Sequence, residues 1–258
     1  MTYEELLSVL GEYAPLSLSE EMCRKDDLYD NSGGILPTDR EVKTVLFTLD
    51  LTAASAAEAE RLGCDVVVTH HPAVYHPIRR LKEGEPLLTL ARKRIGVVSM
   101  HLNFDAARRG IDHYFAEGLG ARNARIASPL GEETGYGRLF DLSPVTAKEL
   151  KSRYESVFRT KKVWLYGDEG TIIRKAASFC GAGLDGEAVG SAVSFGAQLV
   201  ASADVSHHVL LSALESGLCV LSCTHYATEN YGMKKIAEYF RDTRSDLKIC
   251  FFEDERYL

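Results

Sequence analysis

One pattern that occurs twice most constrains the fold of this chain. Each copy is an apolar run that ends in two adjacent histidines, then a connecting segment, then a second apolar run that ends in His-x-x-x-Asp or His-x-x-x-Glu. The first copy spans residues 65–105 and the second spans residues 198–229. Six of the eight histidines lie in these four places. Imidazoles and carboxylates at the ends of buried strands can converge on a metal ion.

The segments around both copies alternate between strand-like and helix-like composition, which predicts parallel strands joined by crossover helices. In the first half the expected strands are residues 45–49, 66–68 and 95–99, with helices at 52–62 and 85–94. In the second half the expected strands are residues 176–180, 199–202 and 219–223, with helices at 186–195 and 209–216. The chain is therefore predicted to be an α/β protein with two similar lobes that arose by internal duplication.

The expected boundary between the lobes is residues 122–137, which are rich in Gly and Ser and contain Pro129. This interpretation places the first α/β lobe at residues 1–127 and the second at 128–229. Residues 230–258 contain a predicted helix at 231–240 and a strand at 248–252, and we expect them to pack back on the first lobe.

Composition is that of an ordinary soluble globular protein, with 45% hydrophobic and 26% charged residues. The net charge of -7 argues against a protein held on nucleic acid by its basic residues. Short basic runs at Arg79-Arg80, Arg108-Arg109 and Lys161-Lys162 are interpreted as solvated faces rather than binding arms.

The first residues are acidic and predict an amphipathic helix rather than a signal peptide. No window approaches the roughly twenty apolar residues that a membrane span requires. We therefore expect a cytoplasmic protein with no membrane partner. The six cysteines form no C-x-x-C pair, so they are interpreted as small buried hydrophobes. Cys219 and Cys223 are a weaker alternative as metal thiolates.

The histidines and acids of the repeated pattern follow predicted strands, where open α/β sheets bind ligands. Imidazole with carboxylate suits zinc, iron, manganese or nickel better than calcium. Adjacent histidines on an extended chain point in opposite directions, so both can serve only if the chain turns or if two ions are bound. Pro72 favours such a turn after His71. The residues favour a site with two ions.

Other motifs carry a plainer interpretation. His76 and His113 lie outside the repeated pattern and are expected to have no special role. Residues 181–186 fit G-x-G-x-x-G between a predicted strand and helix, a geometry that can present backbone N–H groups to phosphate. A tight turn is the favoured interpretation of that motif, and a phosphate site is the alternative.

Five segments together resemble a known family, the Nif-three-like dinuclear metal proteins, also called homologues of a type 2 GTP cyclohydrolase I. They are residues 67–72 (VVTHHP), 101–105 (HLNFD), 225–229 (HYATE), 30–33 (DNSG) and 135–138 (GYGR). The resemblance runs from about Leu6 to the C-terminus. It implies a two-lobed α/β fold with the metal site in the cleft between the lobes, and a ring-shaped homohexamer.

The resemblance also implies a set of site residues. The implied metal ligands are His70, His71, Asp105, His225 and Glu229. Two further histidines are predicted as catalytic acid or base groups, or as residues that orient a ligand, namely His101 and His208. This sequence departs from the family at 202–204, where Ser-Ala-Asp replaces Thr-Gly-Asp or Thr-Gly-Glu and puts the local turn in question.

The expected function is that of a dinuclear metal-dependent hydrolase acting on a nucleotide or another phosphorylated small molecule. Two adjacent divalent ions can activate water and stabilise developing negative charge. Ring opening of guanine and phosphoester cleavage both remain open, because the same ligands suit either reaction. The alternative is a non-catalytic metal-binding or adaptor protein, and the plainest alternative is a scaffold whose histidines are merely buried.

Overall fold

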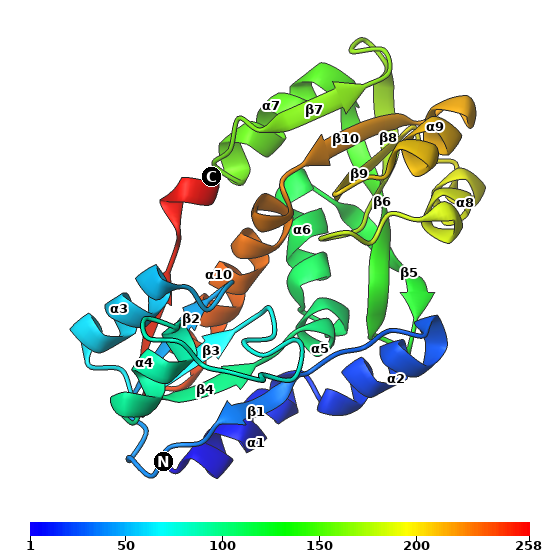
Figure 1. The fold of residues 1–258 in the computed structure, drawn as a ribbon. Coiled ribbons are helices and arrows are strands. Elements are labelled where there is room, and N and C mark those ends of the chain that lie inside the picture. The colour runs from blue at the N-terminus through cyan, green and yellow to red at the C-terminus, as the bar shows by residue number, and fades with distance from the viewer. The chain divides into compact units, whose positions relative to one another are not determined.

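The computed structural model describes every residue from Met1 to Leu258. The chain divides into two compact units. The first contains Met1–Gly110 and Met233–Asp254, and the second contains Ile111–Gly232 and Glu255–Leu258. Each unit has its own sheet with helices packed on it (Figure 1). None of the helices has the length and apolar character needed to cross a membrane.

The first unit is built on a five-stranded sheet with the order β1-β4-β3-β2-β11. Strands β4, β3, β2 and β11 run parallel, and only β1 is antiparallel to its neighbour. The elements of this unit are α1 (Tyr3–Tyr13), α2 (Leu16–Asp26), β1 (Gly33–Leu36), β2 (Thr44–Thr48), α3 (Ala53–Leu62), β3 (Val66–Thr69), α4 (Pro86–Arg92), β4 (Gly96–Ser99), α5 (Leu102–Ala106), β11 (Lys248–Phe252) and the part of α10 (His225–Thr243) from Met233 onward.

One face of this sheet packs against α3 and α4. Leu46, Val67 and Val97 are paired across neighbouring strands, so their side chains lie on the same face. All three are fully buried with Ala56 of α3 and Leu90 of α4 in one hydrophobic cluster. Burial of apolar side chains from both layers stabilises this packing by roughly 1.5–3 kcal/mol per large side chain.

The opposite face of the sheet packs against α10 and is tied to α1. Phe47 of β2 stacks on Phe240 of α10, with 5.5 Å between the ring centroids. The hydroxyl of Tyr3 in α1 donates a hydrogen bond to the carbonyl of Val97 at 2.7 Å. This second layer covers the strands whose ends carry the first candidate ligands.

The second unit is built on a six-stranded sheet with the order β5-β6-β8-β9-β10-β7. Strands β8, β9 and β10 are parallel, and the remaining pairings are antiparallel. The elements of this unit are α6 (Ile111–Leu119), β5 (Arg122–Pro129), β6 (Gly135–Thr146), α7 (Ala147–Val157), β7 (Val163–Tyr166), β8 (Ile172–Ser178), α8 (Gly186–Phe195), β9 (Leu199–Ala203), α9 (His207–Glu215), β10 (Cys219–Cys223), the first part of α10 up to Gly232 and the 3-10 helix η1 (Glu255–Tyr257).

The core of the second unit repeats the layering of the first. Ala177, Val200 and Val220 are paired across β8, β9 and β10. They are buried in one cluster with Ala192 of α8 and Ala213 of α9. The order β-α-β-α-β with parallel strands therefore occurs in both units, as β2-α3-β3-α4-β4 and β8-α8-β9-α9-β10.

The structure confirms the predicted α/β class and the alternation of elements, often to the residue, as for α8, β10 and β11. The expected linker at 122–137 is wrong, because most of it forms β5 and the start of β6, which pair with each other. The boundaries predicted at 127 and 229 fall inside β5 and α10. Strand β5 joins the second unit through that pairing, and α6 joins it by packing on α7, β6 and β8.

Candidate metal centre

The two adjacent histidines of the first unit follow β3, at a turn of the chain. The backbone N–H groups of His70 and His71 both donate to the carbonyl of Leu49, at 3.1 and 3.0 Å. The hydroxyl of Thr69 donates to the carbonyl of His71 at 2.8 Å. Because this turn ends the extended conformation, both rings lie on the same side, with centroids 5.0 Å apart. His70 is fully buried and His71 is partly exposed.

Each of these rings has an oxygen acceptor at Nδ1. Nδ1 of His70 lies 3.0 Å from the carbonyl of Met100. Nδ1 of His71 lies 2.6 Å from Oδ1 of Asp50, the residue two positions after β2. An acceptor at Nδ1 favours the tautomer with the proton on that atom, which leaves the lone pair of Nε2 for a metal ion.

His101 has the same arrangement. It is the N-cap residue of α5, and its backbone N–H donates to the hydroxyl of Ser32 at 2.9 Å. Its Nδ1 lies 2.8 Å from Oδ1 of Asp30. Burial alone would raise the pKa of Asp30, but hydrogen bonds from His101, Ser19 and Ser32 outweigh it and lower the pKa to about 2. Asp30 is thus a fixed anion that orients the His101 ring.

The three rings converge. The candidate ligand atoms of His70, His71 and His101 all lie within 4.8 Å of one another. Nε2 of His70 lies 3.6 Å from Oδ1 of Asp105, and both side chains are buried. Two ligand atoms that each lie about 2.0–2.2 Å from one ion are themselves about 3 to 3.6 Å apart. The donor types, the tautomers and the spacing in the first unit therefore fit a divalent transition metal.

The second unit supplies a smaller group of the same kind. His225 and Glu229 lie four residues apart in the first turns of α10, so their side chains share one face of the helix. Nε2 of His225 is 3.1 Å from Oε1 of Glu229, which is buried. Nδ1 of His225 is 2.7 Å from Oδ2 of Asp204. All four histidines described so far thus have an acceptor at Nδ1.

The glycine motif at 181–186 makes room for this second group. Gly181 has a φ of 54°, and a Cβ atom there would overlap Oε1 of Glu229 and lie 3.1 Å from the ring of His225. The N–H of Gly181 donates to the hydroxyl of Thr228 in α10 at 2.9 Å. Asp185 caps α8 by accepting from Ala188 N–H at 2.8 Å. The motif is therefore a tight turn, and a carboxylate already occupies the helix N-terminus that phosphate would need.

The turn after β9 forms even though residues 202–204 differ from the family pattern. Ala203 is a buried strand residue, and the positive φ of 47° falls on Asp204. Aspartate tolerates this left-handed conformation better than most residues. The missing family glycine therefore does not prevent Asp204 from reaching His225.

Other sequence-predicted residues do not join these groups. His207 and His208 are exposed in the first turn of α9, and the ring of His208 contacts the hydroxyl of Ser206. The structure therefore does not bring His208 to His225 and Glu229. Cys223 is buried and contacts the hydroxyl of Tyr154 at 2.7 Å. Burial raises the pKa of its thiol to about 12, which disfavours the thiolate that a metal requires.

Sequence reasoning missed the carboxylates that orient the rings. Asp50, Asp30 and Asp204 each accept at Nδ1 of a different histidine. Asp50 and Asp204 follow β2 and β9 closely. Open α/β sheets bind ligands beyond the carboxyl ends of their parallel strands, and this rule, which predicted the histidines, applies equally to these two acids. Asp30 belongs to the DNSG segment, whose only signal in the sequence is the family resemblance.

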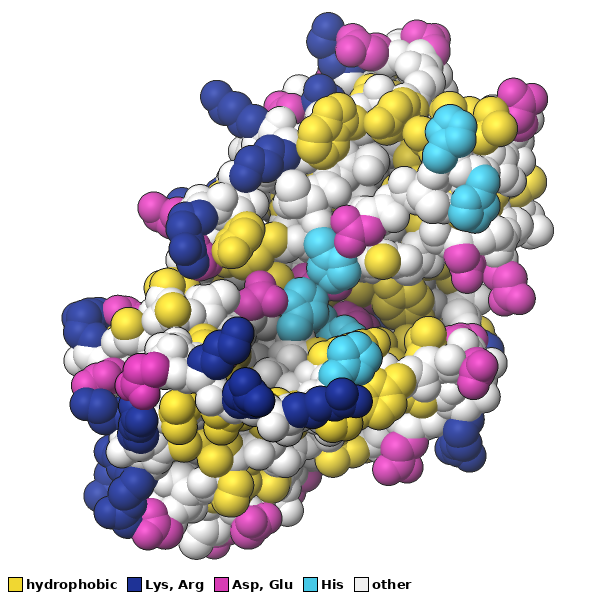
Figure 2. Space-filling view, in the orientation of Figure 1, with side chains coloured by type: hydrophobic (Ala, Val, Ile, Leu, Met, Phe, Trp, Pro, Cys, Tyr) yellow, Lys and Arg dark blue, Asp and Glu magenta, His cyan; other side chains and the backbone are white.

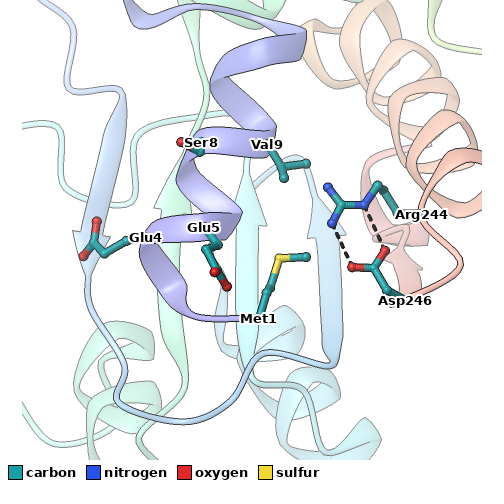
Figure 3. A pocket seen from close by; sticks show the side chains of 7 residues that line it. All are labelled: Met1, Glu4, Glu5, Ser8, Val9, Arg244 and Asp246. Atoms are coloured by element: carbon teal, nitrogen blue, oxygen red, sulfur yellow. Dashed lines mark hydrogen bonds and ion pairs between the residues drawn. The ribbon is translucent and has the colours of Figure 1, made fainter.

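A shallow surface depression of the first unit offers no competing site. It lies where the first turns of α1 face an ion pair between Arg244 and Asp246 (Figure 3). The guanidinium donates to both carboxylate oxygens at 2.9 and 2.8 Å, so these charges satisfy each other. No histidine lies there.

Comparison with known proteins gives consistent matches over nearly the whole chain. Residues 1–256 match the family described as Duf34/NIF3 (NGG1p interacting factor 3). A Clostridium perfringens protein named GTP cyclohydrolase 1 type 2 homolog is 27% identical over 97% of this chain and 95% of its own length. The Schizosaccharomyces pombe protein NIF3 homolog is 31% identical over 81% of each. A hypothetical protein from Staphylococcus aureus has the same fold, with a TM-score of 0.86, 21% identity, and coverage of 98% of this chain and 97% of that one.

Proposed function

This chain belongs to the Duf34/NIF3 family, and we propose that it is a metal-dependent hydrolase of a nucleotide or another phosphorylated small molecule. The proposed ligands of two divalent ions are His70, His71, Asp105, His225 and Glu229. Zinc, iron, manganese and nickel all suit this set of donors. The name of the relatives as GTP cyclohydrolase 1 type 2 homologs supports a nucleotide as the substrate class.

The observation that carries the proposal is the shared orientation of the histidines. Four imidazoles place Nδ1 against an oxygen acceptor, and three of those acceptors are carboxylates. Histidines buried only as core residues would not need candidate ligand atoms gathered within 4.8 Å of one another, as those of His70, His71 and His101 are. A carboxylate behind a histidine fixes its tautomer and raises its basicity as a ligand.

Each residue of the candidate site has a distinct role in the proposed reaction. Asp50 and Asp204 hold the rings of His71 and His225 in place. When bound, two divalent ions would lower the pKa of a water molecule and stabilise negative charge on the substrate. His101, held by Asp30, is the acid–base group that this geometry favours. A catalytic role for His208 stays a prediction, since its exposed ring contacts only Ser206.

Metal content is the first test of this proposal. Protein purified without added metal or affinity tag should contain about two equivalents of divalent metal per chain. His71→Ala and Glu229→Ala should lose most of it. His113→Ala is the matched control, because His113 pairs with Glu117 on α6, outside the candidate groups. Metal absent from the wild type and not restored by zinc, iron or manganese would overturn the proposal.

A second candidate function is a metal-binding protein that acts through protein contacts. The family description as an interacting factor favours it. It predicts the same metal content and the same loss in the two variants. The two functions separate in a screen of nucleotides and phosphoesters, because a hydrolase must keep an open coordination position and turn over substrate.

Three of the sequence-based predictions remain proposals. The common β-α-β-α-β order of the two units supports their origin by internal duplication. Assembly into a homohexamer follows from the family resemblance and is checked by the mass of the protein in solution. A cytoplasmic location stays a prediction and is checked by cell fractionation.

A further inference from the structure

An exposed basic loop follows directly from the histidine turn of the first unit. We define the basic loop as residues 75–82, which come after His70, His71 and Pro72 and are exposed throughout. It carries Arg79, Arg80 and Lys82 and contains no acidic residue. None of these three cations has an ion-pair or hydrogen-bond partner for its side chain.

This absence of partners sets the loop apart from its surroundings. The cations that flank it each pair with a carboxylate, as in Arg61 with Glu58, Lys93 with Glu60, and Arg92 with a glutamate just after the loop. A chain with a net charge of -7 has enough carboxylates to neutralise three more cations. The loop instead presents its positive charge to solvent, beside the exposed apolar side chains of Ile78 and Leu81. Figure 2 shows Lys and Arg side chains exposed next to hydrophobic side chains on the face in view.

An aromatic cluster lies at the beginning of the loop. It consists of Tyr29, Tyr75 and His76, whose rings contact one another. Tyr29 and Tyr75 meet edge to face at 5.7 Å, and the rings of Tyr29 and His76 are nearly parallel at 6.5 Å. Tyr29 is 55% exposed and Tyr75 is 44% exposed. Large aromatic side chains that are this exposed offer flat surfaces on which a planar ring can stack.

The base of the loop is held to the segments that carry the histidines. The N–H of Ala73 donates to the hydroxyl of Ser99 at the end of β4, at 2.9 Å. The side-chain amide of Asn31 donates to the carbonyl of Val74 at 2.6 Å. Asn31 is the neighbour of Asp30, which orients His101. The aromatic cluster and the first ligand group are therefore held by the same short segments.

The chemistry of the basic loop and of the aromatic cluster favours one class of ligand. Guanidinium and ammonium groups bind phosphate oxygens, and aromatic faces stack on nucleobases whatever the base. Three cations suit the few charges of one nucleotide. Polybasic membrane sites typically carry about 4–8 Lys or Arg residues, more than this loop has. The net charge of -7 argues against a protein held along nucleic acid by its basic residues.

We propose that the basic loop and the aromatic cluster form a binding subsite for a nucleoside polyphosphate. The base stacks on the aromatic cluster, and the cations of the loop bind the phosphates. This inference rests on the proposed function, because it names the class of substrate delivered to the metal site. It gives Arg79 and Arg80 a binding role in place of the solvated face expected from the sequence.

The test is calorimetric binding of GTP, guanosine and inorganic tripolyphosphate to the full chain, with metal bound and after chelation. Arg79→Ala/Arg80→Ala should weaken GTP and tripolyphosphate at least about tenfold and leave guanosine unchanged. Tyr75→Ala should weaken GTP and guanosine by about tenfold and leave tripolyphosphate unchanged. Tyr75→Phe keeps the ring and should bind as the wild type does.

The matched control is Lys161→Ala/Lys162→Ala, an exposed pair of cations in the second unit with the same change in charge. It should bind GTP as the wild type does. Equal weakening in this control, or unchanged GTP affinity in Arg79→Ala/Arg80→Ala, would overturn the subsite. So would binding of a short single-stranded oligonucleotide by a protein that does not bind GTP.

The outcomes also separate this inference from the proposed function. Binding of GTP that depends on the loop, without hydrolysis of any nucleotide or other phosphoester, supports the subsite and rejects the hydrolase. Nucleotide hydrolysis with unchanged affinity in both loop variants supports the hydrolase and rejects the subsite. The metal content of every variant should equal that of the wild type, which shows that the metal site has remained folded.

Discussion

Nδ1 of His71 lies 2.6 Å from Oδ1 of Asp50, and the two residues come from the ends of neighbouring parallel strands. The same relationship holds between His225 and Asp204 in the second unit, at 2.7 Å. In each unit the acid follows one strand and the histidine follows the next strand in the sheet. The pairing of the strands thus sets the orientation of the ring before any metal binds.

Removal of either acid should weaken metal binding. We expect Asp50→Ala and Asp204→Ala to reduce metal affinity by about 10- to 100-fold, because the ring loses the acceptor that fixes its tautomer. Asp39→Ala is the control, since Asp39 forms an exposed ion pair with Arg94 and approaches no histidine. Competition titration against a chelator measures the affinities. Wild-type affinity in both acid variants would show that the carboxylates do not prepare the ligands.

Gly181→Ala should disturb the second ligand group more than the fold. The added Cβ would overlap Oε1 of Glu229, and the φ of 54° disfavours any side chain. We expect loss of metal from this variant. Gly190→Ala is the control, because Gly190 lies inside α8 and a Cβ added there would have nothing within 4 Å. That change should preserve metal content and raise the free energy of unfolding by about 0.4–1 kcal/mol. Full metal content in Gly181→Ala would contradict the role given to the glycine motif.

Arg138 should matter for stability rather than for chemistry. Its guanidinium is buried, donates to the carbonyls of Gly135 and Gly137, and lies 3.3 Å from Asp112. Arg138→Met would leave the buried charge of Asp112 without its cation, and we expect a loss of about 3–5 kcal/mol in the free energy of unfolding. The exposed Arg174→Met should change it by less than about 0.5 kcal/mol. Denaturant unfolding of both variants measures the difference, and similar values for the two would reject this interpretation.

Tyr3 should contribute to the loss of stability at alkaline pH. Burial, and to a lesser degree the charge of Glu4, raises its pKa to about 12. The unfolded chain ionises this tyrosine near pH 10, whereas the folded chain keeps it neutral. The stabilising contribution is therefore complete below about pH 10 and is lost as the pH rises through about 12. Between pH 9 and 11 the wild type should lose about 1 kcal/mol more of its unfolding free energy than Tyr3→Phe. Equal pH slopes for the two proteins would contradict the prediction.

The order of strands and helices in both units could be predicted, because most of these elements have a recognisable hydrophobic pattern in the sequence. Strands β3, β4 and β9 of these β-α-β-α-β segments are short, mostly apolar and buried on both faces, so they stand out as uninterrupted runs. The helices between them have clear ends. Thr52 caps the N-terminus of α3, and Gly63 ends it with a φ of 65°.

The hairpin of β5 and β6 was mistaken for a linker because its local signals are weak. Strand β5 is largely exposed rather than an apolar run, and Gly135 and Gly137 lie at the start of β6. Both glycines have a positive φ, and a Cβ on either would overlap neighbouring atoms. These glycines allow close packing within a sheet. In the sequence alone, glycines at such positions are equally typical of a flexible linker.

The candidate ligands were predicted from the sequence, but the symmetry between the two pairs of histidines was not a reliable guide. His70 and His71 occupy the turn after β3, whereas His207 and His208 begin α9 after three intervening residues beyond the end of β9. Identical dipeptides therefore fall in different local structures. Where a strand ends depends on its neighbours in the sheet, and a single sequence does not contain that information.

The separation of the candidate donors from the hydrophobic layers has an evolutionary consequence. The layers centred on Val67 and Val200 involve strand interiors and helix faces, whereas the donors lie in turns and helix starts. Substitutions that abolish the chemistry therefore leave most of the packing intact. Proteins descended from such a chain could lose the catalytic activity, keep a stable fold and acquire another function. A shared architecture among relatives is then compatible with activity in some of them and with none in others.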